Sequence, residues 1–80
     1  MSLKTAEVYV IDDDAAAREA VAVLVRTLGL EVYEYPSAES FLFSYQGYRP
    51  ACIVADLRML GMSGLEMLVE LRRRGLTIPV

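Results

Sequence analysis

An apolar run at positions 51–55, closed by the single carboxylate of Asp56, is the feature that most constrains the fold of this chain. A continuous run of small and β-branched apolar residues is typical of a strand buried on both faces within a parallel sheet. Because a buried strand excludes charge, we expect Asp56 to lie where the strand leaves the core. In open α/β sheets ligands bind at this carboxyl edge. The run therefore predicts a functional carboxylate there.

Strand and helix patterns alternate along the rest of the chain. Further strands are predicted at 7–11 and 31–35, and the opening of a fourth at 77–80. Three helices, at about 15–28, 37–46 and 63–74, are predicted from apolar residues at helical spacing: Val21, Leu24, Val25 and Leu28; Phe41, Leu42 and Tyr45; Leu65, Leu68, Val69 and Leu71. This order predicts an α/β fold, a doubly wound parallel sheet with right-handed crossovers that stops at the start of strand four.

The boundaries of these elements are marked by capping and turn residues. Asp13 or Asp14 can cap the first helix, and Ser37 the second. Gly29 and Gly75 are placed to end the first and third helices, and a turn is predicted at 47–50. The basic run at 72–74 falls in a last helical turn, where arginines complement the helix dipole.

Composition argues against two further classes of function, nucleic-acid binding and membrane spanning. The net charge of −3 and pI near 4.8 argue against direct nucleic-acid binding, which needs a clustered basic face. No apolar run approaches the ~20 residues of a membrane span. The single cysteine, Cys52, is predicted to be a small buried core residue. We therefore expect a cytoplasmic protein without a membrane partner.

Two acidic positions follow predicted strands: Asp12, Asp13 and Asp14 after the first, and Asp56 after the third. In a sheet of order 2-1-3 these strands are neighbours about 4.8 Å apart, and the chain reverses direction between them. Each like-charged pair at ~5 Å would cost about 3 kcal/mol at an effective dielectric of ~20, which favours protonation or a bound cation. Oxygen ligands without any histidine indicate Mg²⁺.

A carboxylate beside Mg²⁺ can attack phosphorus and form an aspartyl phosphate. On this interpretation Asp56 is the phosphoacceptor, Asp12 and Asp13 hold the ion, and Asp14 caps the helix. Each acidic position alone is also compatible with plain helix capping or with a turn. Their coincidence at neighbouring strand ends favours the site.

The residues VYVIDDD at 8–14 and DLRMLGMSG at 56–64 resemble the receiver domain of two-component response regulators, especially its FixJ-like branch. The resemblance implies a flavodoxin-like (CheY-like) fold, with residues 1–80 forming the phosphoacceptor half. It implies phosphoryl transfer to Asp56 from a sensor histidine kinase in a phosphorelay that regulates transcription through an output domain. By position, Asp13 and Asp56 would bind Mg²⁺ directly, Asp12 largely through water, and Arg58 through its backbone carbonyl.

The sequence departs from the family pattern in three places. Leu60 stands where the family usually has proline. The family's Thr/Ser after strand four and Lys after strand five have no counterpart among these 80 residues. We therefore expect the chain as given to bind Mg²⁺ weakly and to be phosphorylated poorly or not at all.

An alternative hypothesis is a truncated, unphosphorylated interaction module that forms a homodimer through an open sheet edge. On both hypotheses the chain is not an enzyme beyond assisting its own phosphorylation and dephosphorylation. A haloacid-dehalogenase-type phosphatase is excluded because Arg58 stands where a second aspartate is required. A Rossmann dehydrogenase is excluded because the turn after the first strand contains no glycine.

Overall fold

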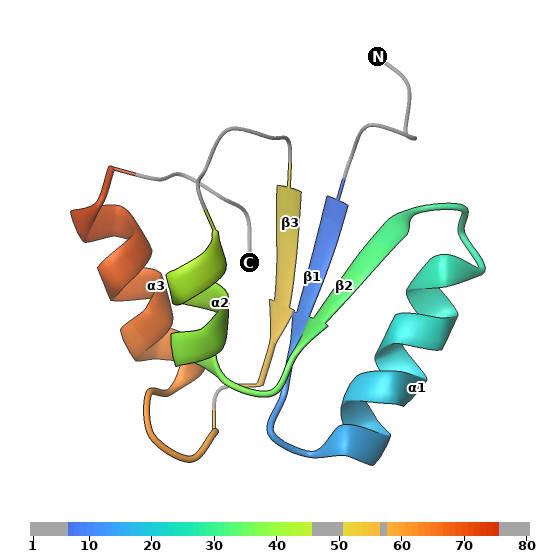
Figure 1. Cartoon of the computed structure of the whole chain (residues 1–80), viewed down its shortest axis with the longest axis horizontal. Coiled ribbons are helices and arrows are strands. Elements are labelled where there is room, and N and C mark those ends of the chain that lie inside the picture. Colours follow the sequence, from blue (N-terminus) through green and yellow to red (C-terminus); the bar gives the residue numbers. More distant parts are fainter. Residues whose placement is uncertain (1–6, 46–50, 57, 76–80) are drawn as a thin grey trace.

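The computed structural model describes residues 7–45, 51–56 and 58–75. Six elements follow one another: β1 (Glu7–Ile11), α1 (Ala15–Arg26), β2 (Glu31–Tyr35), α2 (Ala38–Ser44), β3 (Ala51–Ala55) and α3 (Gly64–Arg73). The strands form a parallel sheet in the order β2-β1-β3 (Figure 1). The predicted alternation, strand direction and order are confirmed, and the fold is flavodoxin-like. The predicted fourth strand at 77–80 and turn at 47–50 lie outside the described residues.

The two faces of the sheet are covered by different helices. Tyr9 and Ile11 of β1 point to one face, where they share a buried cluster with Phe41 of α2 and with Met67 and Leu71 of α3. Val8 and Val10, which alternate with them, are buried on the opposite face, and α1 contacts β1 and β2. The sheet therefore separates a larger α2–α3 core from a smaller α1 core.

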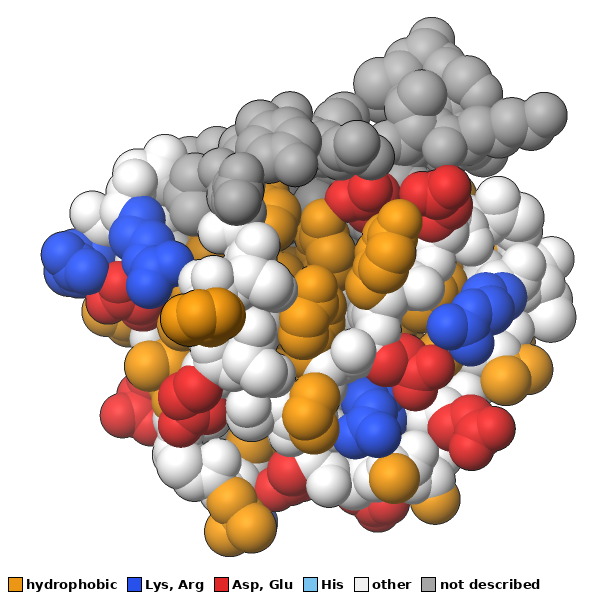
Figure 2. Space-filling model, in the orientation of Figure 1, with side chains coloured by type: hydrophobic (Ala, Val, Ile, Leu, Met, Phe, Trp, Pro, Cys, Tyr) orange, Lys and Arg blue, Asp and Glu red, His pale blue; other side chains and the backbone are white. Residues whose placement is uncertain are grey.

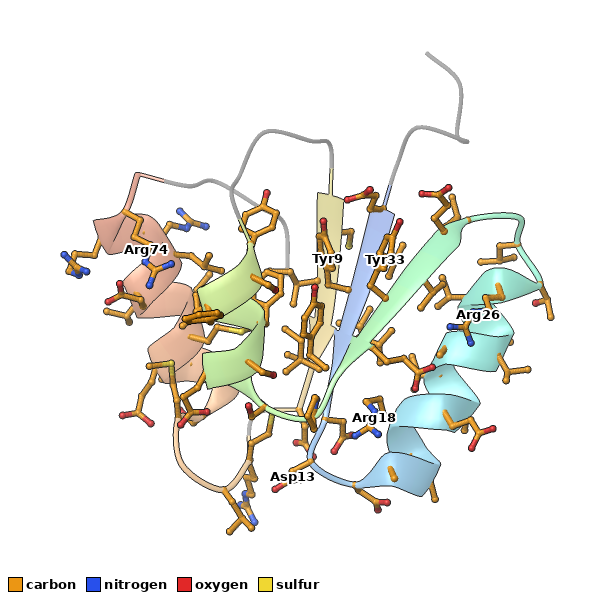
Figure 3. All side chains as sticks on the ribbon, viewed as in Figure 1. Tyr9, Asp13, Arg18, Arg26, Tyr33 and Arg74 are labelled. Atoms are coloured by element: carbon orange, nitrogen blue, oxygen red, sulfur yellow. The ribbon has the colours of Figure 1, made fainter. Side chains whose placement is uncertain are left out.

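Aromatic rings make up much of the larger core. The Tyr9 ring centroid lies 5.2 Å from that of Phe41, 5.5 Å from Tyr45 and 5.8 Å from Tyr33. Figure 2 shows hydrophobic side chains gathered in the centre of this view, and Figure 3 shows Tyr9 and Tyr33 side by side there. The Tyr9 hydroxyl donates a hydrogen bond to the buried carboxylate of Glu7. Burial, followed by this hydrogen bond, raises the pKa of Tyr9.

Helix ends follow the predicted caps. Asp14 is the N-cap of α1, and Ser37 caps α2. Ser63 forms a capping box with Glu66 at the start of α3. Gly29 and Gly75 adopt positive φ angles of 83° and 80° beyond α1 and α3, as expected for residues that end helices. None of the helices within the described ranges is long and apolar enough to cross a membrane.

The arginines at the end of α3 bind specific partners. Arg73 and Arg74 both pair with Glu70, each at 2.7 Å, and their hydrogen bonds lower the pKa of Glu70 to about 2. Arg74 Nη1 also donates to the carbonyl of Leu42, 3.1 Å away. The basic run thus links α3 to α2 in addition to its predicted place in the last helical turn.

The predicted helix faces were partly wrong. In α1 the fully buried residue is Ala22, while Leu24 and Leu28 are 66% and 68% exposed. In α3 the buried residues are Gly64, Met67 and Leu71, whereas Leu65 and Val69 are each 62% exposed. In α1 the face that meets the sheet carries Ala22, and in α3 it carries Gly64, Met67 and Leu71. The exposed leucines lie off this face.

The predicted burial of 51–55 on both faces was also wrong. Ile53 is buried in the α2–α3 core, but Cys52 is exposed and Val54 is 39% exposed. Cys52 and Val54 pair with Val8 and Val10 and share their face of the sheet. Because α1 lies against β1 and β2, it does not cover this face of β3. The prediction of Cys52 as a core residue is therefore incorrect.

Candidate functional site

The carboxyl ends of β1 and β3 bring the two predicted acidic positions together. Ile11 pairs with Ala55, so Asp12 and Asp56 leave the sheet beside one another. The Asp56 amide donates to the Ile11 carbonyl at 3.3 Å, which extends the ladder one residue beyond β3. Figure 3 shows Asp13 at this edge, at the opposite end of the sheet from the hydroxyl of Tyr9. The predicted adjacency of these strand ends is confirmed.

Asp12 and Asp14 shape the turn into α1. Asp12 Oδ1 accepts the Asp14 amide at 3.0 Å. Asp14 Oδ1 accepts the amides of Ala16 and Ala17 at 3.0 and 3.4 Å. Asp14 is thereby committed to capping α1, as predicted, whereas Asp12 is partly buried in the turn.

Asp13 and Asp56 each accept one hydrogen bond from the segment that follows β3. Asp56 Oδ1 accepts the Arg58 amide at 3.1 Å. Asp13 Oδ2 accepts the Leu60 amide at 2.9 Å, a contact between residues 47 positions apart. Both carboxylates are exposed. The hydrogen bond to Asp13 therefore joins the 58–60 segment after β3 to the turn after β1.

The donor set suits a hard cation with few protein ligands. Carboxylates of Asp12, Asp13 and Asp56 and the backbone of Arg58 gather at one edge, and each carboxylate already accepts one amide through a single named oxygen. Across the described ranges, no three Asp, Glu, His or Cys side chains form a ready-made metal cage. Mg²⁺ is commonly bound by one or two carboxylates and several waters, so these residues fit it.

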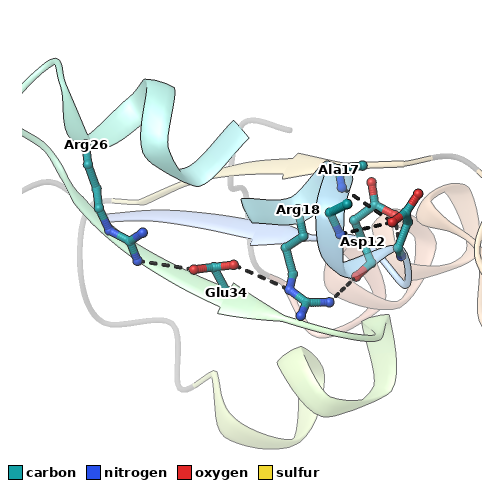
Figure 4. A network of polar contacts seen from close by, with 7 residues as sticks. Asp12, Ala17, Arg18, Arg26 and Glu34 are labelled. Carbon is teal, nitrogen blue, oxygen red and sulfur yellow. Dashed lines mark hydrogen bonds and ion pairs between the residues drawn. The ribbon is translucent and has the colours of Figure 1, made fainter. Parts of the chain in front are cut away.

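Arg18 links the site to α1 and β2, and nothing in the sequence pattern had indicated this role. Its Nη1 donates to the Asp12 carbonyl at 2.8 Å, and its Nε lies 3.5 Å from Glu34 Oε1. Arg26 Nη2 lies 3.3 Å from the other oxygen of Glu34 (Figure 4). The turn that carries Asp12 is therefore held by a side chain from α1.

Glu39 is a second residue that the sequence pattern did not indicate. It lies in the first turn of α2, and its Oε2 accepts the Met62 amide at 3.0 Å. The two residues are 23 positions apart, and a backbone amide carries no signature of residue type. This hydrogen bond holds the backbone at Met62, two residues beyond the amide that Asp13 accepts.

Comparison with known proteins identifies relatives over nearly the whole chain. The family model described as the response regulator receiver domain matches residues 8–80. The transcriptional regulatory protein FixJ of Azorhizobium caulinodans is 50% identical over 68 residues, which are 85% of this chain and 32% of FixJ. The response regulator protein TodT of Pseudomonas putida is 39% identical over all 80 residues, or 35% of TodT. The chain thus spans about a third of the length of these relatives.

Solved structures show the same architecture. The FixJ-N crystal structure superposes with a TM-score of 0.87 at 34% identity, over 99% of this chain and 62% of that one. The chemotaxis protein CheY4 of Vibrio cholerae gives a TM-score of 0.79 at 27% identity, over 89% of this chain and 59% of CheY4. The flavodoxin-like, CheY-like fold predicted from the resemblance is confirmed.

Proposed function

Because the chain belongs to the response regulator receiver domain family, we propose that Asp56 accepts a phosphoryl group in two-component signalling. The observation that carries this proposal is the pairing of Ile11 with Ala55, which sets Asp56 beside Asp12 at the carboxyl edge of the sheet. This is the edge at which open α/β sheets bind ligands. Asp56 is exposed there, so a phosphodonor can reach its carboxylate.

The contacts of Asp56 suggest how the transfer proceeds. The Arg58 amide donates to Oδ1 and fixes the carboxylate plane, and Oδ2 attacks the phosphorus. A new O–P bond forms while the N–P bond of a phosphohistidine donor breaks, and the leaving imidazole nitrogen keeps the electron pair and takes a proton from solvent. Bound Mg²⁺ would neutralise charge on the phosphoryl oxygens as the anionic nucleophile approaches.

Asp12, Asp13 and the Arg58 carbonyl are the residues proposed to hold Mg²⁺ beside Asp56. Asp13 already binds the Leu60 amide through Oδ2, so Oδ1 is the oxygen proposed for the ion. Leu60 is 83% exposed and its side chain contributes no ligand. Replacing the family's usual proline with Leu60 therefore keeps the amide that Asp13 binds, since proline has no N–H to donate.

The partners proposed for the chain follow from the family. The phosphodonor is a sensor histidine kinase, the location is the cytoplasm, and the output is transcriptional, as the name of the FixJ relative states for that protein. With a net charge of −3, the chain itself is not proposed to bind nucleic acid. DNA would be reached only through a further domain.

Labelling of Asp56 by a small acyl phosphate or phosphoramidate, in a chain extended to include the family's Thr/Ser after strand four and Lys after strand five, tests the proposal. We expect a Mg²⁺-dependent gain of one phosphoryl group by intact mass, which hydroxylamine removes and Asp56→Asn abolishes. Asp14→Asn is the matched control, because asparagine caps helices as well as aspartate and Asp14 is committed to α1. Labelling that survives in Asp56→Asn, or no labelling at saturating Mg²⁺ and donor, would refute the assignment.

A further inference from the structure

Residues 58–62, which follow Asp56 in the described part of the chain, are held at three points. The side chain of Met59 is buried in the α2–α3 core. The Leu60 amide donates to Asp13 at 2.9 Å, and the Met62 amide donates to Glu39 at 3.0 Å. Between these amides lies Gly61. The path of this segment therefore depends on two carboxylates as much as on its own side chains.

Gly61 shows how closely Glu39 approaches the segment. Its φ angle of 74° lies in the left-handed region, which glycine adopts without strain. A Cβ atom built at this position would lie 2.5 Å from Glu39 Oε2. The Glu39 carboxylate therefore fills the space that a side chain would need. The backbone of residues 61–62 therefore lies directly against this carboxylate.

We propose that Glu39 is a positioning residue: its carboxylate fixes the 59–63 segment so that the Leu60 amide reaches Asp13. Glu39 is itself exposed, but the helix that carries it is anchored by its buried residues Ala38, Phe41 and Leu42. The link runs from α2 through the Met62 amide to Leu60 and Asp13. Its consequence for phosphorylation rests on the function proposed above for Asp56.

A different role for Glu39 gives a different expectation. A carboxylate in the first helical turn also stabilises the helix through its dipole. Glu39→Gln removes the charge but keeps a side-chain oxygen that accepts the Met62 amide. If the hydrogen bond is what matters, Glu39→Gln behaves as the wild type. If the dipole is what matters, it behaves as Glu39→Ala.

Amide hydrogen exchange measured by NMR distinguishes these roles. In Glu39→Ala we expect the Met62 and Leu60 amides to exchange about tenfold faster, as expected for loss of one hydrogen bond. Amides of β1 should keep their wild-type rates. Glu39→Gln and the control Glu19→Ala, which removes an exposed carboxylate from α1, should leave both loop amides unchanged. Unchanged exchange at Met62, faster exchange confined to Met62, or a glutamine variant that matches alanine would overturn the proposal.

The labelling rate of Asp56 supplies the functional readout. We expect Glu39→Ala to lower the Mg²⁺-dependent rate with a small phosphodonor and Glu39→Gln to restore it. Equal rates in Glu39→Ala and wild type would remove Glu39 from the reaction. If the extended chain with wild-type Glu39 is never labelled, the function proposed for Asp56 is refuted, whereas the exchange rates would still decide whether Glu39 positions the segment.

Discussion

Replacing Met67 by alanine should destabilise the chain far more than replacing Leu65, although the helical pattern places Leu65 on the apolar face. Met67 is fully buried between α3 and the sheet, in the same cluster as Ile53 and Phe41. Leu65 lies on the same helix but is 62% exposed. The two truncations therefore test which face of α3 is buried.

The expected magnitudes follow from these burials. Truncating a fully buried methionine costs about 2–5 kcal/mol, because transfer free energy is lost and a cavity remains. Full burial of a leucine is worth ~1.5–3 kcal/mol, so the minority of its surface that Leu65 buries is worth about 1 kcal/mol or less. A domain of 80 residues has a total stability of about 4–12 kcal/mol. Met67→Ala should therefore remove a large share of it.

Urea unfolding followed by far-UV circular dichroism measures both changes. We expect Met67→Ala to lower the unfolding midpoint strongly and Leu65→Ala to lower it slightly, with similar slopes. Met67→Leu conserves volume and should cost less than about 1.5 kcal/mol, which separates cavity formation from loss of the thioether. A Leu65→Ala variant as unstable as Met67→Ala would show that α3 packs on the face predicted from its leucines.

Three further predictions concern Cys52, the cap of α1 and the end of α3. Cys52 should react with a maleimide in the native chain nearly as fast as in urea, and protection of the thiol would contradict its exposure. Asp14→Ala should lower the free energy of unfolding by about 1 kcal/mol in urea titrations, and Asp14→Ser should retain most of it. The pKa of Glu70, lowered from 4.5 to about 2, means that its pairing stabilises the fold above pH 4.5 and is lost as the pH falls to 2. Glu70→Gln should flatten the fall in Tm across that window, and equal slopes would contradict this.

The strand direction could be predicted because crossover connections obey strong rules, and the order 2-1-3 was expected from the doubly wound class of sheet. The short β-α units require parallel neighbours, and the carboxyl edge then follows for both acidic positions. The buried helix faces could not be predicted as well, because hydrophobicity ranks leucine above alanine and glycine. The structure buries Ala22 and Gly64 and leaves Leu24 and Leu65 exposed. The buried Gly64, Met67 and Leu71 also follow a helical spacing, so the period of the sequence alone does not decide between the two faces of α3.

In the candidate site, too, some residues could be predicted from the sequence and others could not. Asp12 and Asp56 could be located from the sequence because each directly follows a strand, so the strand register sets their positions. The contacts of Glu39 and Arg18 could not be predicted, because each is made to a backbone atom. Glu39 accepts the Met62 amide, and Arg18 donates to the Asp12 carbonyl. Any residue offers these atoms, so no motif records the contact. The sequence therefore predicts the carboxylates of the site, but it does not predict the side chains of Glu39 and Arg18 that hold the adjoining loops.

Helices on the two faces of the sheet support different parts of the surroundings of Asp56. On one side, Met59 lies in the α2–α3 core and Glu39 binds the Met62 amide, so the segment after Asp56 is supported by α2. On the other side, α1 reaches this edge through the bond of Arg18 to the Asp12 carbonyl, which supports the turn after β1. A change in the packing of α2 therefore acts on the segment that follows Asp56. A change in α1 acts on the opposite wall of the site, where Asp12 and Asp13 lie.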